Sequence, residues 1–467
     1  MQKKIIIITL VSITLILSIE FIMKNNKAKI AKITVNPENA LFDDPLEISV
    51  SNLKPQEQFT LELSSKDKDN YLWESAAIFK ADDKGIVNVA QQSPISGSYS
   101  GIDPMGLFWS MKPTSKDLSK NTFLSLITLN LCEVTLSVFS DNKLLAQKTI
   151  HRQCMPDNVE RKEIRDEGIV GTLFYPKDQK KNPGVIAIPG SGGIIPEHIA
   201  NLLAAHGYTV LALAYFGYEG LPEKLSLIPL EYFQKAMEWL KKQPQVESNN
   251  IAIMGHSRGG EAVLLLASLF PKEMDAVIAF SSPHLVYGDF LPESKSAWTY
   301  KNKPLPFMPY PSDQEISKAA KDGLITLHKG TIEDPFRDSE IFLYGMKKDE
   351  STAKKTAIPV ENIRCPLLII SGDDDAMWPS AAAGKKVIER LNAQGSTIEK
   401  KHLNYSDAGH NLLVPPYLPA LDLPVNMAAG WSLFGGTPEG NACAQKESWH
   451  EMLNFLKKHM KSETSKQ

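Results

Sequence analysis

A serine flanked by glycines stands where the sequence pattern changes, and its surroundings suit a nucleophile. Residues 251–254 are apolar and rich in β-branched side chains, as a buried strand requires. A Gly-x-Ser-x-Gly motif follows at residues 255–259, and residues 261–267 continue with helical spacing. This strand–turn–helix order is typical of a nucleophile elbow, in which glycines let the backbone turn tightly. We predict that Ser257 is a catalytic nucleophile; the alternative is an ordinary strand-to-helix turn.

A serine hydroxyl needs a base that takes its proton and a carboxylate that holds the base. In an α/β-hydrolase sheet the acid and then the histidine follow the serine along the chain. Three consecutive aspartates close the apolar run at residues 366–370, and we predict Asp375 as the acid, with Asp374 as the alternative. The predicted base is His410, in a loop after a predicted strand at residues 397–403. A solvated acidic turn is the competing interpretation of the aspartates, since aspartate is favoured in turns.

Four other histidines compete less well for the role of base. His206 belongs to a predicted helix end, and His256 adjoins the nucleophile, where we expect it to line the pocket. His198 and His284 are expected to be surface or packing residues.

Backbone amides are the expected donors to an oxyanion. The amide of Arg258 lies at the predicted helix N-terminus, where the helix dipole favours negative charge. A glycine-rich loop at residues 189–193 follows the first predicted parallel strand, but its spacing matches neither a Walker nor a Rossmann motif. We predict that an amide near Ser191 or Gly192 completes the oxyanion hole.

Composition excludes several other classes of function. The chain has 467 residues, 43% hydrophobic and 22% charged, as in a globular protein of two or three domains. A formal net charge of −3 and a pI near 6.4 give no basic field, so nucleic acid is not an expected partner. Four scattered cysteines indicate neither a zinc site nor a disulfide scaffold. No metal or organic cofactor is expected.

The N-terminus carries an apolar run from Ile5 to Met23, interrupted by Glu20. Its length nearly reaches the roughly 20 residues that span a bilayer. We predict a signal anchor over residues 1–26 that makes this a single-pass membrane protein. The alternative is export after cleavage of a signal peptide, although no small-x-small cleavage site follows. Lysines on both flanks leave the sidedness open.

Two patterns divide the rest of the chain. Residues 30–157 alternate apolar and polar side chains between turn signals, which predicts an antiparallel β-sandwich with one solvated face. The charged stretch at residues 158–167 is the expected boundary. Residues 160–462 alternate buried strands with amphipathic helices, which predicts a doubly wound, mostly parallel α/β sheet. Residues 281–362 form a long excursion, to which we assign acyl-chain or leaving-group recognition.

Outside the N-terminal run, the chain resembles the acyl-CoA thioesterase and bile acid-CoA:amino acid N-acyltransferase family. The resemblance covers almost everything after residue 26 and includes many positions with no evident catalytic role. The matching segments are residues 40–45, 97–109, 171–174, 214–222, 230–233, the elbow, 358–361, 372–378, Gly409-His410 and 415–417.

This resemblance implies an immunoglobulin-like domain followed by an α/β-hydrolase domain with the triad Ser257, Asp375 and His410. Conjugating members generally use cysteine as the nucleophile and hydrolases use serine, so Ser257 favours hydrolysis of a small-molecule acyl thioester. Three alternatives stay open: an acyltransferase that conjugates the acyl group to an amino acid or another acceptor, a hydrolase of ordinary esters, and a non-enzymatic binding module. Acyl-chain length and oligomeric state stay open as well.

Overall fold

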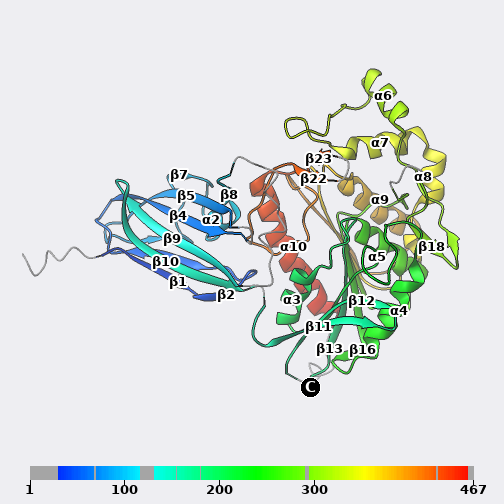
Figure 1. Cartoon of the computed structure of the whole chain (residues 1–467), viewed down its shortest axis with the longest axis horizontal. Coiled ribbons are helices and arrows are strands. Elements are labelled where there is room, and N and C mark those ends of the chain that lie inside the picture. Colours follow the sequence, from blue (N-terminus) through cyan, green and yellow to red (C-terminus); the bar gives the residue numbers. More distant parts are fainter. Residues whose placement is uncertain are drawn as a thin grey trace, which may run out of the picture.

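A computed structural model describes residues 30–67, 70–115, 131–153, 155–178, 180–289, 294–427 and 430–460. Figure 1 shows an all-β part formed by the N-terminal third of the chain, beside a larger part in which helices surround a central sheet. The long helix α10 (Pro438–His459) lies between them.

Two sheets that share one core make up the all-β part. Its strands bury alternate residues, because successive side chains of a strand point to opposite faces. The smaller sheet has the order β1 (Lys32–Asn36), β3 (Glu47–Ser51), β6 (Val87–Asn88). The larger has the order β2 (Asn39–Leu41), β10 (Lys143–Gln153), β9 (Leu131–Ser140), β4 (Gln58–Lys66), β5 (Leu72–Lys80), β7 (Ser96–Gly97), and β8 (Lys112–Pro113) also pairs with β5.

An eight-stranded sheet carries the larger part. Its order is β11 (Val159–Asp166), β12 (Ile169–Pro176), β14 (Thr209–Leu213), β13 (Asn182–Ile188), β16 (Val246–His256), β17 (Ala276–Phe280), β20 (Leu367–Gly372), β21 (Lys400–Tyr405). Strand β12 runs antiparallel to both neighbours, and the other pairs are parallel. The predicted α/β-hydrolase sheet is confirmed. The charged segment at residues 158–167, expected as a boundary, contains the whole of β11.

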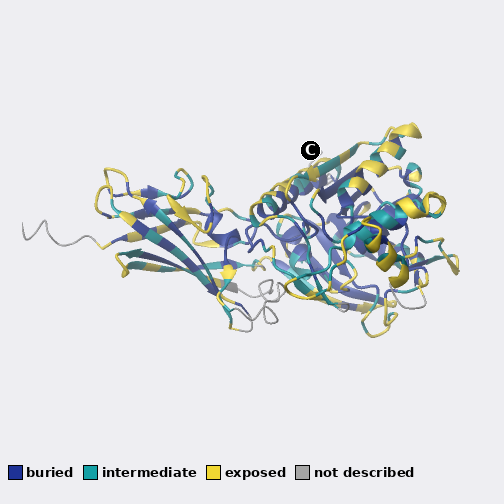
Figure 2. Ribbon diagram, turned by 90° about the horizontal axis from the view of Figure 1, so that it is seen from above, coloured by how far each residue is buried: buried dark blue, intermediate teal, exposed yellow. Residues whose placement is uncertain are grey.

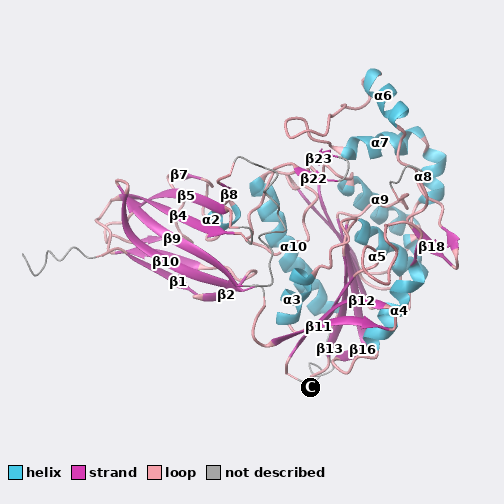
Figure 3. Ribbon diagram, in the orientation of Figure 1, coloured by secondary structure: helices cyan, strands magenta, loops and turns pink. Residues whose placement is uncertain are grey.

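Helices cover both faces of this sheet, as Figure 3 shows. One face packs on α3 (Glu197–Ala205) and α10, and the other on α4 (Leu230–Lys241), α5 (Arg258–Leu269) and α9 (Ser380–Ala393). Alternate residues of one strand therefore belong to different cores: Val185 and Ala187 face α3, whereas Ile186 and Ile188 face the opposite layer. Burial on both faces explains why the strand sequences are continuously apolar. Figure 2 shows this buried interior in dark blue.

The long excursion between β17 and β20 contains short helices and strands joined by loops. It contains β18 (Trp298–Tyr300), β19 (Lys303–Pro304), α6 (Asp313–Lys321), α7 (Asp338–Lys348), α8 (Glu350–Thr356) and η3 (Val360–Asn362). The remaining short elements are α2 (Gly106–Trp109), β15 (Ile228–Pro229), β22 (Val425–Met427) and β23 (Gly430–Ser432). Helices α6 and α7 stand over the carboxyl end of the sheet (Figure 1).

Polar contacts join the two parts at a buried interface. The Asp43 carboxylate accepts hydrogen bonds from His206 Nε2 at 2.5 Å and Trp449 Nε1 at 3.0 Å. The buried guanidinium of Arg152 donates to the carbonyl oxygens of Phe42 and Tyr417. The hydrogen bond that His206 donates to the Asp43 carboxylate raises the pKa of His206. His206 thus helps to join the all-β part to the larger part.

The structure contradicts the prediction of a membrane location. No helix in the described ranges is both long enough and apolar enough to cross a bilayer. The anchor predicted over residues 1–26 lies outside the described residues, and the apolar run at the N-terminus was the only basis for that prediction.

The raised pKa of His206 predicts pH-dependent stability. A raised folded-state pKa contributes stability fully below the unfolded histidine value of about 6.5, and that contribution is lost as pH rises through the folded value. Urea unfolding should therefore show His206→Gln to be less stable than the wild type near pH 6, with the difference shrinking towards pH 9. Glu38→Gln, which removes an exposed ion pair with Lys148, is the control and should change little. A His206→Gln difference that is constant across this range would contradict the assignment.

Candidate active site

Ser257 sits at a sharp turn between β16 and α5. Its backbone has φ of 57° and ψ of −118°, a conformation that L-residues rarely adopt. The turn requires glycine on both sides: a Cβ on Gly255 would lie 2.2 Å from Gly259 O, and one on Gly259 would lie 2.4 Å from Ile188 O. The serine is thereby held at the carboxyl edge of the sheet, the arrangement of a nucleophile elbow.

The structure brings Asp375 and His410 together. His410 Nδ1 lies 2.9 Å and 3.0 Å from the two carboxylate oxygens of Asp375, and both side chains are buried. The carboxylate also accepts hydrogen bonds from the amides of Met377 and Trp378 and from Ser380 Oγ at 2.6 Å. These donors fix the carboxylate at the start of α9, so it can orient the imidazole.

Asp374, the alternative acid, points elsewhere. Its carboxylate accepts from Arg337 Nη2 at 2.7 Å and from the amide of Gly436 at 2.9 Å, and its side chain is about half exposed. It does not contact His410 within the described chain, which leaves Asp375 as the residue paired with the histidine.

His256 supports the backbone of His410. The carbonyl oxygen of His410 lies 2.8 Å from His256 Nε2 and 2.7 Å from Ser281 Oγ, so both groups donate to it. Burial lowers the pKa of His256 to about 3, and the neighbouring His410 adds to this effect. The ring therefore stays neutral with its proton on Nε2. Its low pKa makes it a weak proton acceptor, and the described carboxylate of the site is paired with His410 instead.

The hydroxyl of Ser257 accepts a hydrogen bond from Trp378 Nε1 at 3.0 Å. Within the described residues it makes no hydrogen bond with His410. Catalytic hydrogen bonds are often formed only with substrate bound, so this geometry is compatible with general-base catalysis. Sequence reasoning missed Trp378, although the acidic turn that carries it had been singled out.

The predicted oxyanion loop adjoins the elbow because β13 and β16 are parallel neighbours. A Cβ on Gly190 would lie 3.1 Å from Ser257 Cβ, and Ser191 lines the same cavity as Ser257. Gly192 is exposed, and a Cβ there would meet nothing within 4 Å. Arg258 begins α5 directly after the nucleophile. The structure thus places all three predicted donors at one end of the sheet.

A buried ion pair lies behind the elbow. Arg258 Nη1 donates to Glu261 at 2.7 Å, and both side chains are fully buried. Glu261 Oε1 also accepts from the amide of Tyr287 at 3.0 Å and from Trp298 Nε1 at 2.7 Å. Arg258 in turn donates to Gly288 O. These bonds attach the first part of the excursion to the first turn of α5, and no sequence pattern predicts this link.

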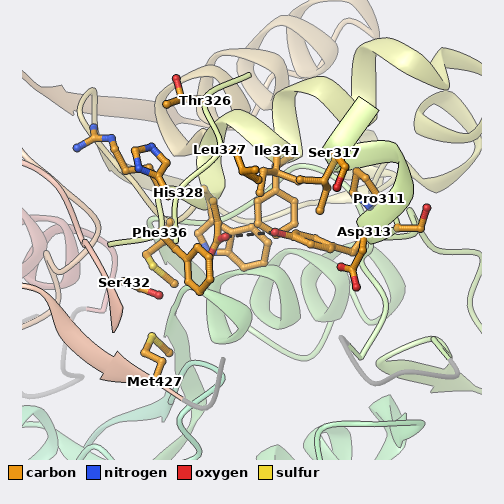
Figure 4. Close-up of a pocket in the computed structure, with 18 of the residues that line it drawn as sticks. Pro311, Asp313, Ser317, Thr326, Leu327, His328, Phe336, Ile341, Met427 and Ser432 are labelled. Carbon is orange, nitrogen blue, oxygen red and sulfur yellow. Dashed lines mark hydrogen bonds between the residues drawn. The ribbon is translucent and has the colours of Figure 1, made fainter. Parts of the chain in front are cut away.

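A cavity of about 1070 Å³ opens onto Ser257 beneath helices α6 and α7. Figure 4 shows Leu327, Phe336 and Ile341 on the side of the excursion, with Met427 approaching from another segment. Trp378 and Phe342 also line it, with ring centroids 4.7 Å apart. The wall is mostly apolar, as expected for a site that holds an aliphatic chain.

The charges on this wall do not form a cationic cradle. Arg337 is paired with Asp374, and His328 is paired with Asp334 at 2.8 Å. The wall also carries Asp338, whose pKa is raised by burial. Among the described residues, no group of three or more histidine, cysteine, aspartate or glutamate side chains could hold a metal ion.

His198 and His284 lie outside the constellation. Burial lowers the pKa of each to about 4, so each is neutral near pH 7. Neither lines the cavity, in agreement with packing roles.

Comparison with known proteins identifies relatives across most of the chain. Residues 43–166 match the family described as acyl-CoA thioester hydrolase/BAAT N-terminal region, and residues 228–462 match BAAT/acyl-CoA thioester hydrolase C terminal. The mitochondrial acyl-coenzyme A thioesterase 2 of Mus musculus is 30% identical, covering 93% of this chain and 90% of that protein. Acyl-coenzyme A thioesterase 6 of the same organism is 31% identical, covering 93% and 98%.

A solved structure, the alpha/beta hydrolase GrgF from Penicillium sp. sh18, aligns with 66% of this chain and 99% of its own. The identity is 18% and the TM-score is 0.39.

The contacts of the two neighbouring histidines predict opposite outcomes on substitution. His410→Gln should lower kcat by several orders of magnitude, because no other described imidazole is paired with Asp375. His256→Gln can still donate to His410 O and should retain activity within about tenfold. Steady-state kinetics between pH 5 and 9 provide the measurement. A His256→Gln variant as inactive as His410→Gln would show that His256 does more than support the backbone.

Proposed function

Because the chain belongs to the acyl-CoA thioester hydrolase/BAAT family, we propose that it hydrolyses acyl-CoA thioesters to a free acid and CoA through an acyl-Ser257 intermediate. The observation that carries this proposal is the set of contacts at one end of the sheet. Ser257 on a strained elbow, the buried Asp375–His410 pair and a largely apolar cavity meet there.

In the proposed first step, His410 Nε2 takes the proton of Ser257 while Oγ attacks the thioester carbonyl carbon. Asp375 holds Nδ1–H, which keeps the imidazole in the tautomer that accepts at Nε2. The developing oxyanion is held by the amide of Arg258 with an amide from Ser191 or Gly192. Collapse of the intermediate expels the thiolate of CoA, which takes the proton from His410.

In the second step, water attacks the acyl-serine with His410 again acting as the base. The acyl chain occupies the apolar cavity, whose wall includes Phe336, Ile341 and Phe342. Among the described residues of the wall there is one arginine, Arg337, and it is already paired with Asp374, so the phosphates of CoA are expected to stay outside the cavity. The acyl group is therefore the part of the substrate that this site selects.

The proposal extends to the domain organisation. Residues 30–157 are assigned to an immunoglobulin-like β-sandwich and residues 160–462 to the catalytic domain. The shared core of the two N-terminal sheets and the start of β11 at Val159 support this division.

Substitution of the nucleophile tests the mechanism. Ser257→Ala in the full chain should lower CoA release from a panel of acyl-CoAs by several orders of magnitude. Release would be followed with a thiol reagent. Asp374→Asn is the matched control, since Asp374 lies on the same turn but bonds Arg337, and it should retain most activity. CoA release by Ser257→Ala at a rate near that of the wild type would refute the acyl-serine mechanism.

Hydrolysis and transfer are distinguished by the fate of the acyl group. The serine nucleophile favours water as acceptor, so addition of glycine or taurine should yield free acid and no conjugate by mass spectrometry. A conjugate that grows with amine concentration would assign an acyltransferase. Cleavage of simple esters without any CoA release would assign an ester hydrolase with the same triad.

A further inference from the structure

Trp378 directly contacts the atom that forms and breaks the acyl bond. Its indole Nε1 lies 3.0 Å from Ser257 Oγ, and indole nitrogen can only donate, so Oγ is the acceptor. Trp378 as a whole is 4% exposed, and its ring lies near those of Tyr287 and Phe342, with centroid distances of 5.5 Å and 4.7 Å. These neighbours leave the indole little freedom to turn away from the serine.

The same turn presents Trp378 to the nucleophile and Asp375 to the base. The backbone amide of Trp378 donates to Asp375 Oδ1 at 3.0 Å, and that carboxylate holds His410. The guanidinium of Arg258, with its carbon 5.6 Å from the ring centroid, adds a cation–π contact. Contacts with Ser257, Asp375 and Arg258 therefore fix the position of Trp378.

We propose that the N–H of Trp378 is a catalytic hydrogen-bond donor that assists release of the acyl group from Ser257. This inference rests on the proposed acyl-serine reaction and adds a residue to it. The ester oxygen of an acyl-serine is a weak acceptor. The same oxygen carries developing negative charge when its bond to carbon breaks, so a donor fixed beside it stabilises the transition state more than the ground state.

Hydrolysis of the acyl-serine requires only water, His410 and the oxyanion donors already described. Water loses a proton to His410 Nε2 while its oxygen bonds to the acyl carbon, giving a tetrahedral oxyanion. When the oxyanion collapses, the carbon–Oγ bond breaks and its electron pair goes to Oγ. Oγ receives the proton held by His410, which releases the carboxylic acid and restores the serine. Trp378 keeps its own proton throughout and stabilises Oγ during the bond cleavage.

The test measures acylation and deacylation separately in the full chain. With p-nitrophenyl butyrate, stopped-flow measurement of the first turnover of p-nitrophenol release reports acylation of Ser257, and intact mass spectrometry follows decay of the butyryl-enzyme. Trp378→Phe keeps an aromatic ring but lacks the N–H. Deacylation should slow roughly tenfold to a hundredfold, the effect of losing a hydrogen bond to a charged group. Acylation should change less, so acyl-enzyme should accumulate.

An isosteric analogue separates hydrogen bonding from packing. Incorporation of 3-benzothienylalanine at position 378 replaces N–H by sulfur and keeps the bicyclic shape, and it should slow deacylation as Trp378→Phe does. Normal deacylation with this analogue, or equal losses in both steps, would overturn the proposal. A wild-type chain that releases no p-nitrophenol and no CoA above the Ser257→Ala background would instead refute the proposed function, so the two failures are distinguishable.

Discussion

The site depends on a backbone turn that costs energy to hold. Ser257 has a positive φ, a conformation with a cost of order 1–3 kcal/mol for a residue other than glycine. Surrounding bonds hold it: its amide donates to Phe280 O at 2.9 Å, and its carbonyl accepts from the amide of Glu261 at 3.0 Å. A Cβ on Gly260, in the first turn of α5, would lie 2.6 Å from Ser282 Cβ, so this position also leaves no room for a side chain. The elbow can form only where β16, β17 and α5 converge.

A close approach between the loops after β20 and β21 brings the acid Asp375 and the base His410 together. A Cβ on Gly372, the last residue of β20, would lie 2.1 Å from Ala408 O, so the loops after β20 and β21 run side by side. This explains why Asp375 and His410, which are 35 residues apart in sequence, meet at hydrogen-bonding distance. Two glycine-dependent contacts between neighbouring strand ends therefore set the positions of nucleophile, acid and base.

The sequence predicted those parts of the site that follow from strand ends. A recognisable buried strand precedes each of Ser257, Asp375 and His410, and parallel strands bring their carboxyl ends to one edge of a sheet.

Side-chain contacts between distant segments could not be predicted in this way, because no sequence pattern marks them. Trp378 is 121 residues from Ser257, and no periodicity relates the two. The pairing of β11 with β12 was not predicted, because the exposed charged side chains of β11 hide its strand pattern. The apolar N-terminal run supported a membrane prediction that the described helices do not bear out.

The loop that carries the base also ties the two parts of the molecule together. Seven residues after His410, the carbonyl of Tyr417 accepts from Arg152, and Ala420 donates to the carbonyl of Trp109 at 2.8 Å. Tyr417 and Ala420 belong to the hydrophobic core of the all-β part. Arg152 is buried between the rings of Phe42 and Phe108, and a buried cation is costly unless such partners surround it. Removing the all-β part would therefore uncover the far end of the segment whose near end holds His410. These contacts link the N-terminal sheets to the loop that carries His410, although the cavity-lining residues in the described part of the chain all come from the larger part.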